Sequence, residues 1–216
     1  MKKGLTELVF VVDRSGSMAG LESDTIGGIN ATLARNREAA GDAIVSIVLF
    51  DNDSKVLVDR VPINQVRDLT ERDYQVRGCT ALLDCLGGSI RHIERVQGYM
   101  PDDHKAEHVI FVITTDGYEN ASQRYTYADV KRAIEQRTEE GWEFVFLGAN
   151  IDAVGEAARI GISADRAATY IADGEGSAVM FESVGKACVS MRCASAEAPM
   201  SADWKRSIEE DVAARG

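Results

Sequence analysis

Short, nearly continuous apolar runs alternate with helical patterns along this chain. The runs cover residues 8–12, 44–50, 109–113 and 144–147, with a weaker one at 167–171. A strand that is apolar on both faces is buried on both faces, as in a parallel sheet covered by helices. The pattern therefore predicts an α/β fold with a mostly parallel sheet at its centre.

The segment 55–61 differs from the other predicted strands. Only Asp51-Asn52-Asp53-Ser54 separates it from the run at 44–50. A connection this short makes a hairpin, so we expect this strand to be antiparallel and to lie at an edge of the sheet. Asp51 and Asp53 are interpreted as residues that shape the hairpin turn, and not as ligands of a second ion.

Apolar residues also recur at helical spacing between the strands. The marker positions are Ile26, Ile29 and Leu33, then Leu82, Leu86, Ile90 and Ile93, then Tyr127, Val130 and Ile134, with a short helix at 153–158 and a last one marked by Val184, Cys188 and Met191. This alternation predicts a doubly wound, Rossmann-like sheet with helices on both faces. In such sheets, ligands bind beyond the carboxyl ends of the strands, where the strand order reverses.

Length and composition fit a single domain with a sizeable core, because the 216 residues are 45% hydrophobic and no Pro/Gly/Ser-rich linker divides them. We expect this domain to cover residues 1–193. Residues 194–216 are expected to form a tail, in which Trp204, Ile208 and Val212 mark a short amphipathic helix over 202–214. That helix either packs back on the domain or docks on another chain.

Charge and targeting signals narrow the class of protein. The formal net charge of −11 opposes binding to a phosphate backbone, so no nucleic-acid partner is expected. No apolar stretch reaches the roughly 18 residues that a membrane span needs. The basic start of the chain is followed by an apolar run that ends at Asp13 without a small-residue cleavage site, so we expect a cytoplasmic protein that does not bind membranes. The four cysteines have neither disulfide-scaffold nor zinc-site spacing and are expected to be free thiols.

Three polar segments at the ends of predicted elements carry the candidate chemistry. Asp13, Ser15 and Ser17 follow the first strand, Thr80 precedes the second helix, and Asp116 follows the strand at 109–113. Carboxylate and hydroxyl oxygens are the hard ligands that Mg²⁺ prefers. Each segment alone also fits a local role, since Ser15-Gly16-Ser17 and Asp116-Gly117 suit turns and Thr80 suits a helix N-cap. The order of all three is what favours a metal site.

This arrangement resembles the von Willebrand factor A (VWA) domain with a complete metal-ion-dependent adhesion site (MIDAS), in its bacterial stand-alone type. The likeness runs from about residue 5 to residue 191, and no position of the five-residue pattern is missing. The resemblance implies a six-stranded sheet in the order 3-2-1-4-5-6 with one antiparallel edge strand. It also implies that Mg²⁺ is the cofactor, with Mn²⁺ and Ca²⁺ as alternatives, and that a carboxylate of a partner protein completes the coordination of the ion.

Further residues in the ligand loops are candidates for a partner-binding rim around the metal: Arg14, Met18, Tyr118, Glu119 and Asn120. A charge-assisted bond from Arg14 to a docked carboxylate is one expected contribution. Two different roles are considered for Glu119. It repels an acidic partner, or it binds the metal of a neighbouring molecule and so holds that site closed. Exposed loop residues without a role are the alternative for the whole set.

The leading hypothesis is a metal-dependent, adhesion-type protein-binding module that is not an enzyme. Its partner is expected to present Asp or Glu, and the resemblance implies AAA+ ATPases as one class of partner. One alternative is a Mg²⁺-dependent phosphoryl-transfer enzyme, although Ser15 stands where haloacid-dehalogenase-like phosphatases carry a second Asp. The other is a scaffold that acts through its helical faces or its tail without using the metal.

Overall fold

A six-stranded sheet forms the centre of the computed structural model, which describes residues 1–194 and 200–216. The strands are β1 (Lys2–Asp13), β2 (Asp42–Phe50), β3 (Ser54–Pro62), β4 (Ala106–Thr115), β5 (Glu143–Ala149) and β6 (Ala167–Tyr170). Their order is β3-β2-β1-β4-β5-β6, as the resemblance implied. Only β3 runs antiparallel to its neighbour, as the short connection after β2 predicted.

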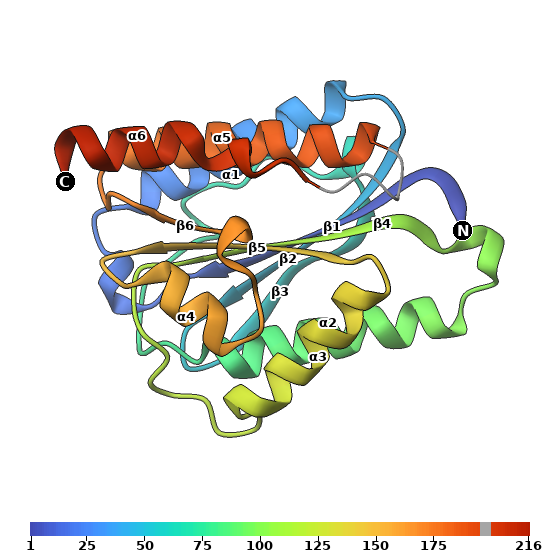
Figure 1. Ribbon diagram of the computed structural model, residues 1–216, viewed down its shortest axis with the longest axis horizontal. Helices are drawn as coiled ribbons and strands as arrows, with labels where there is room; N and C mark the ends of the chain where they lie inside the picture. Colours follow the sequence, from blue (N-terminus) through green and yellow to red (C-terminus); the bar gives the residue numbers. More distant parts are fainter. Residues whose placement is uncertain (195–199) are drawn as a thin grey trace.

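Helices cover both faces of the sheet (Figure 1). On one face lie α1 (Glu22–Glu38), α5 (Gly174–Cys193) and α6 (Arg206–Arg215), and on the other lie α2 (Leu82–Tyr99), α3 (Tyr127–Glu139) and α4 (Ala153–Arg159). Short 3-10 turns are η1 (Gly16–Met18), η2 (Ile63–Gln65), η3 (Asp102–His104), η4 (Ala164–Arg166) and η5 (Ala202–Lys205). In residues 1–194 and 200–216, no helix combines the length and the apolar character that crossing a bilayer requires.

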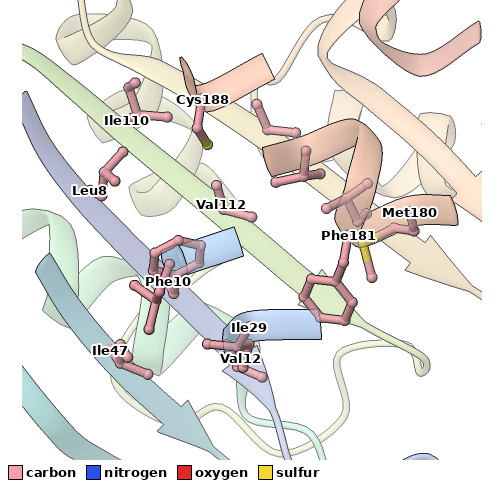
Figure 2. Packing of buried hydrophobic residues seen from close by; sticks show 14 of the residues in the cluster. Leu8, Phe10, Val12, Ile29, Ile47, Ile110, Val112, Met180, Phe181 and Cys188 are labelled. Carbon is pink, nitrogen blue, oxygen red and sulfur yellow. The ribbon is translucent and has the colours of Figure 1, made fainter. Parts of the chain in front are cut away.

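The central strand β1 explains why the apolar runs show no alternation. Leu8, Phe10 and Val12 pack in the core under α1 and α5, whereas Val9 and Val11 belong to the core under α2. Successive side chains of a strand point to opposite faces, so a strand between two helical layers needs apolar residues at every position. Figure 2 shows Leu8, Phe10 and Val12 pointing toward the side chains of α1 and α5.

The two long helices on this face approach each other closely at Gly28. A Cβ atom at this position would lie 1.9 Å from a ring carbon of Phe181 in α5. The absence of a side chain at Gly28 therefore gives the Phe181 ring its place against α1. The neighbouring Gly27 has open space around the same position.

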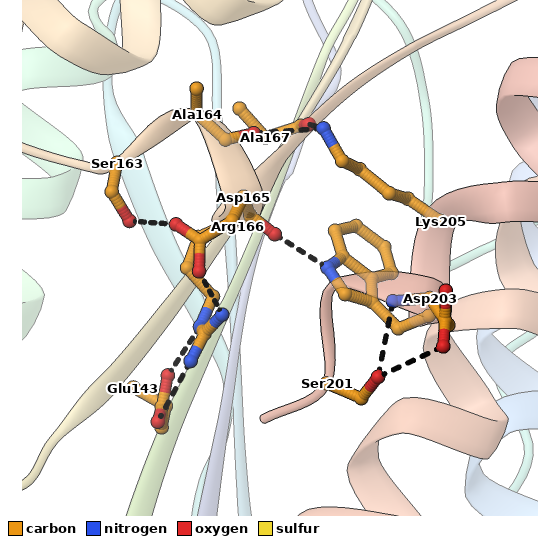
Figure 3. Close-up of polar contacts among 10 residues, drawn as sticks. Glu143, Ser163, Ala164, Asp165, Arg166, Ala167, Ser201, Asp203 and Lys205 are labelled. Atoms are coloured by element: carbon orange, nitrogen blue, oxygen red, sulfur yellow. Dashed lines mark hydrogen bonds and ion pairs between the residues drawn. The ribbon is translucent and has the colours of Figure 1, made fainter. Parts of the chain in front are cut away.

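The C-terminal segment packs on the domain. Ile208 of α6 is buried in the core between α6 and α5, and the indole N–H of Trp204 donates to the carbonyl of Asp165 at 2.8 Å. Figure 3 shows Asp165 and Lys205 in this contact region. The ammonium of Lys205 donates to the carbonyls of Ala164 and Ala167 at 2.9 and 3.1 Å. The helix predicted over 202–214 is thus a 3-10 turn followed by α6. Residues 195–199, at the start of the predicted tail, lie outside the described part.

Two adjacent substitutions in α1 test the helix contact. Gly28→Ala is expected to destabilise the fold by about 1–3 kcal/mol, because the new methyl group overpacks against Phe181. Gly27→Ala, the matched control, is expected to leave stability unchanged or raise it by up to about 1 kcal/mol, since alanine is the better helix former. Urea unfolding followed by circular dichroism measures both. Equal effects of the two substitutions would contradict the packing described here.

Candidate metal centre

The carboxyl ends of β1 and β4 bring the two candidate carboxylates together. The strands are parallel neighbours, with Val12 opposite Thr114. Asp13 ends β1, and Asp116 lies one residue beyond the end of β4. Two strand ends that lie far apart in sequence thereby deliver their acids to the same point of the sheet edge, at the position where the strand order reverses.

Hydroxyl groups lie around the same point. Ser17 Oγ is 3.0 Å from Ser15 Oγ and donates to Asp116 Oδ1 at 2.5 Å. The third hydroxyl comes from Thr80, just before α2. A Cβ atom built on Gly117 would lie 3.4 Å from both Ser17 Oγ and Thr80 Oγ1, so these two hydroxyls converge on the space beside this glycine. The structure therefore gathers all five predicted ligands in one place.

Asp13 is the buried member of the pair. Its Oδ1 accepts the backbone N–H of Ser15 and its Oδ2 accepts the hydroxyl of Thr115, both at 2.6 Å. Burial raises the pKa of Asp13 to about 6, although the hydrogen bonds from Thr115 and Ser15 lower it and so offset part of the effect. The negative charge of Asp116 adds a smaller increase.

The pKa of Asp116 is raised for the same reason as that of Asp13. Burial raises its pKa, and the hydrogen bond from Ser17 offsets only part of that rise. Among the described residues, no Lys, Arg or His forms an ion pair with Asp13 or Asp116, and the main influences on their pKa values include no basic side chain. Two desolvated carboxylates without a basic partner, flanked by three hydroxyls, fit a hard divalent cation.

The donor set differs from other kinds of metal site. In the part of the chain that the structure describes, no group of three or more His, Cys, Asp or Glu side chains is placed to hold a metal ion. This finding excludes a zinc-type cluster there. A candidate site in which two carboxylates are combined with neutral hydroxyls remains compatible with this finding.

Asn120 fixes the position of Thr80. The side-chain Oδ1 of Asn120 accepts the backbone N–H of Thr80, and the backbone N–H of Asn120 donates to the carbonyl of Thr80, each at 3.0 Å. The segment after Asp116 is thereby joined to the segment before α2. Asn120 is exposed, as a rim residue would be, but its amide already serves this link.

Glu119 anchors the same loop and does not point at the metal position. Its carboxylate accepts the N–H of Leu83 at the start of α2, the N–H groups of Ala121 and Ser122, and the hydroxyl of Ser122. These four bonds hold the loop on the helix. The two roles considered for Glu119, repulsion of a partner and closure of a neighbouring site, are therefore not what its contacts indicate.

Asp84 completes the anchoring of this loop, a role that the sequence did not reveal. It accepts the backbone N–H groups of Gln123, Arg124 and Tyr125 at 3.0, 2.8 and 2.9 Å. Burial alone raises the pKa of Asp84, but the three bonds outweigh it and the pKa is lowered. The available sequence signal was an acid in the first turn of a helix, which ordinarily indicates an interaction with the helix dipole.

Two of the five predicted rim residues are inside the protein. The guanidinium of Arg14 forms a buried ion pair with Asp51 at 2.9 Å, and Asp51 also accepts a bond from Arg77 at 2.6 Å. Met18 is buried in the core next to α1. The prediction that these two residues belong to the rim is therefore wrong, because Arg14 is held inside by its ion pair with Asp51 and Met18 packs in the core. Asp51 also accepts the N–H of Asp53, in agreement with a role in the hairpin turn.

Tyr118 is the second exposed rim candidate, beside Asn120. Half of it is accessible to solvent, and its hydroxyl accepts the backbone N–H of Asp152 at 3.3 Å. Val154, which follows Asp152 by two residues at the start of α4, also has an exposed apolar side chain. The ring therefore lies at the surface, two residues after Asp116 in the chain, with its hydroxyl bound to the β5–α4 connection.

Similar folds occur in several solved structures. Proximal thread matrix protein 1 from the mussel byssus, in a structure with a zinc-occupied MIDAS motif, aligns with a TM-score of 0.59 and 17% identity over 87% of this chain and 46% of its own. A von Willebrand factor type A protein from Catenulispora acidiphila aligns with a TM-score of 0.53 and 19% identity, over 87% of this chain and 43% of its own.

A third similar structure is the pilus adhesin SpaC from Lactobacillus rhamnosus GG in an open conformation. It has a TM-score of 0.61 and 13% identity, over 88% of this chain and 30% of its own. This chain thus spans less than half the length of each of these three proteins. No family model and no curated protein matches the sequence. The chain has a VWA-like Rossmann fold.

Metal affinity is expected to depend on pH through Asp13. A cation must displace the proton from this carboxyl below its pKa of about 6. The affinity for Mg²⁺ or Mn²⁺ should therefore fall about tenfold between pH 7 and pH 5, with proton release on binding. Calorimetric titrations in buffers of different ionisation enthalpy measure both quantities. A constant affinity over this range would show that Asp13 is already ionised throughout.

The free energy of unfolding tests the same carboxylate without metal. The pKa of Asp13 in the folded chain, about 6, exceeds its ordinary value of 3.8, so the ionised group destabilises the fold above pH 6 and ceases to do so as the pH falls below 3.8. Asp13→Asn should therefore stabilise the metal-free protein by up to about 2 kcal/mol at pH 7.5. The gain should shrink toward pH 4. Urea unfolding in EDTA at both pH values gives the answer, and a gain that does not change with pH would assign it to another cause.

Proposed function

We propose that this chain is a protein-binding module that depends on a divalent metal and captures an Asp or Glu side chain of a partner protein. The metal would be held by a complete MIDAS set: Asp13, Ser15, Ser17, Thr80 and Asp116. The observation that carries the proposal is the pair of desolvated carboxylates, which lack a basic partner and have hydroxyls beside them. Mg²⁺ is the expected ion, and Mn²⁺ and Ca²⁺ are alternatives.

The charge balance of the ligand set supports capture of an acidic group. Two carboxylates match the charge of a divalent cation, while the three neutral hydroxyls are weak metal ligands. A bound cation would supply a Lewis-acidic position that attracts a further anionic oxygen. Ser17 is exposed, so the site is accessible to a partner from solvent. Of the proposed rim, Tyr118 and Asn120 are at the surface beside this opening.

The surroundings of the two carboxylates do not favour catalysis. Their side-chain oxygens accept bonds from Ser and Thr hydroxyls and from a backbone N–H. None of these groups is a general base at neutral pH. Ser15, in the position where a phosphatase of the haloacid-dehalogenase type has its acid/base Asp, bonds to Ser17. We therefore propose a binding module and not an enzyme.

The similar structures support the same class of function. One is described with a zinc-occupied MIDAS motif and another as a pilus adhesin. For this chain we propose a cytoplasmic bacterial setting, in which an AAA+ ATPase is one candidate for the partner. Nucleic acids and membranes are not proposed as partners, since the net charge is −11.

Calorimetry with a substitution in the site tests the metal part of the proposal. The protein stripped with EDTA should bind one Mg²⁺ or Mn²⁺, and Asp116→Ala should abolish that binding, because it leaves a single carboxylate. Glu139→Ala, at the exposed end of α3 next to the amino end of β5, should bind as the original chain does. Unchanged binding by the Asp116 variant would show that the cation binds elsewhere.

Partner capture is then tested with the same three proteins. A protein recovered with the immobilised chain in Mg²⁺ should be lost in EDTA and lost with Asp116→Ala, and retained with Glu139→Ala. Substituting Asp and Glu residues of that partner one at a time should identify the single side chain whose loss abolishes capture. Capture that persists in EDTA would favour the scaffold alternative, in which the helical faces or the tail make the contact.

A further inference from the structure

A second candidate site lies at the opposite end of the sheet. A cavity of about 700 Å³ opens between the last turns of α2, the start of β4 and the end of α3. Its lining includes Met1, Ala106 at the start of β4 and Trp142, which directly precedes β5. The cavity is therefore at the amino ends of the strands, whereas the candidate metal site is at the carboxyl ends of β1 and β4. Figure 1 shows how these strands run between the two helical layers.

The charge of this cavity is opposite to that of the whole chain. Its lining contains four basic side chains, Arg91, Arg95, Lys105 and Arg137, and two acidic ones, Glu94 and Glu140. The chain as a whole has a net charge of −11. Basic side chains are thus concentrated at one place on a chain whose net charge is negative. This local concentration of positive charge attracts anions.

The basic side chains are not equally available to a ligand. Arg137 lies over the ring of Trp142 and pairs with Glu140 at 2.7 Å and with Glu94 at 3.8 Å. These contacts compensate its charge. Lys105 pairs with Asp102 at 2.7 Å.

Arg91 and Arg95, by contrast, form no ion pair with any residue in the described part of the chain. They are exposed and one helical turn apart on α2, so their side chains lie on the same face. Like charges at this spacing weaken a helix slightly. A bound anion would remove that repulsion.

The geometry points to a binding site for a small phosphate-bearing molecule in this cavity, with its phosphate between Arg91 and Arg95. Two guanidinium groups offer planar, bidentate donors that match phosphate oxygens. The volume is within the usual range for small-molecule sites, roughly 300–1,000 Å³. Tyr99, the most exposed of the large hydrophobic side chains in the described residues, lies in the lining and offers an aromatic face to the rest of the ligand.

Nuclear magnetic resonance titrations in EDTA test this site separately from the metal centre. The probes are adenosine monophosphate, ribose 5-phosphate and adenosine, which distinguish the phosphate from the base. Of the two tryptophans in the chain, Trp142 lines the cavity and Trp204 lies in η5. Both phosphates are expected to shift the indole N–H signal of Trp142 and not that of Trp204, whereas adenosine should bind at least about tenfold more weakly than adenosine monophosphate.

A double substitution tests the two arginines. Arg91→Gln with Arg95→Gln should weaken phosphate binding about 10- to 100-fold. The control is Lys131→Gln with Lys186→Gln, which changes the net charge equally at two exposed lysines of α3 and α5 and should leave binding unchanged. The thermal midpoint of each variant shows that the fold is retained.

Three results would overturn the assignment. One is no response of Trp142 to either phosphate up to about 10 mM, which corresponds to an affinity too weak to be specific. Another is equal binding of adenosine and adenosine monophosphate. The third is an equal loss in the two double variants, which would mean that bulk charge alone attracts the anion. Asp116→Ala should bind the phosphates normally, so a failure of the proposed metal function would not affect this test.

Discussion

The pairing of two parallel strands, β1 and β4, determines where the candidate ligands of this fold meet. Each strand is followed by an acid, and their adjacency places two carboxylates at one point of the sheet edge. Burial makes ionisation of both unfavourable, and the described part of the chain supplies no basic group to compensate. A divalent cation would satisfy this arrangement, because it would be attracted by both charges at once.

The buried acids of the molecule fall into two classes according to their partners. Asp51 has Arg14 and Arg77, Asp84 accepts three backbone N–H groups, and the half-buried Glu119 accepts four bonds. These acids hold loops in place. Asp13 and Asp116 have weaker compensation and raised pKa values. The difference in compensation, and not burial itself, separates the anchoring acids from the candidate metal ligands.

The anchoring acids also position the candidate metal ligands. The loop after Asp116 is fixed on α2 by Glu119 and Asp84, and Asn120 joins it to Thr80. The hydroxyl of Thr80 and the carboxylate of Asp116 therefore come from a single rigid unit. At the other end of the same sheet the basic cavity is built from the far end of α2, so one helix borders both candidate sites.

Much of the fold was predictable from local pattern. The apolar runs located the strands, because a strand buried on both faces needs apolar residues throughout, and the short link before residue 55 predicted the antiparallel edge. The strand order followed from the resemblance alone, since periodicity does not specify which strands are neighbours. Gly28 gave no local signal of its role, because the ring that occupies its space belongs to α5.

The features of the candidate site can also be separated into those that short segments specify and those that depend on distant contacts. Local pattern was enough to predict which oxygen ligands are present and that each stands at the end of a strand or before a helix, because these are properties of short segments. Contacts between distant segments explain why Arg14 and Met18 are buried, why Glu119 anchors a loop, and why Asp13 and Asp116 have no ion-pair partner. The orientation and charge environment of a side chain depend on neighbours from distant segments, and folding alone brings those neighbours together.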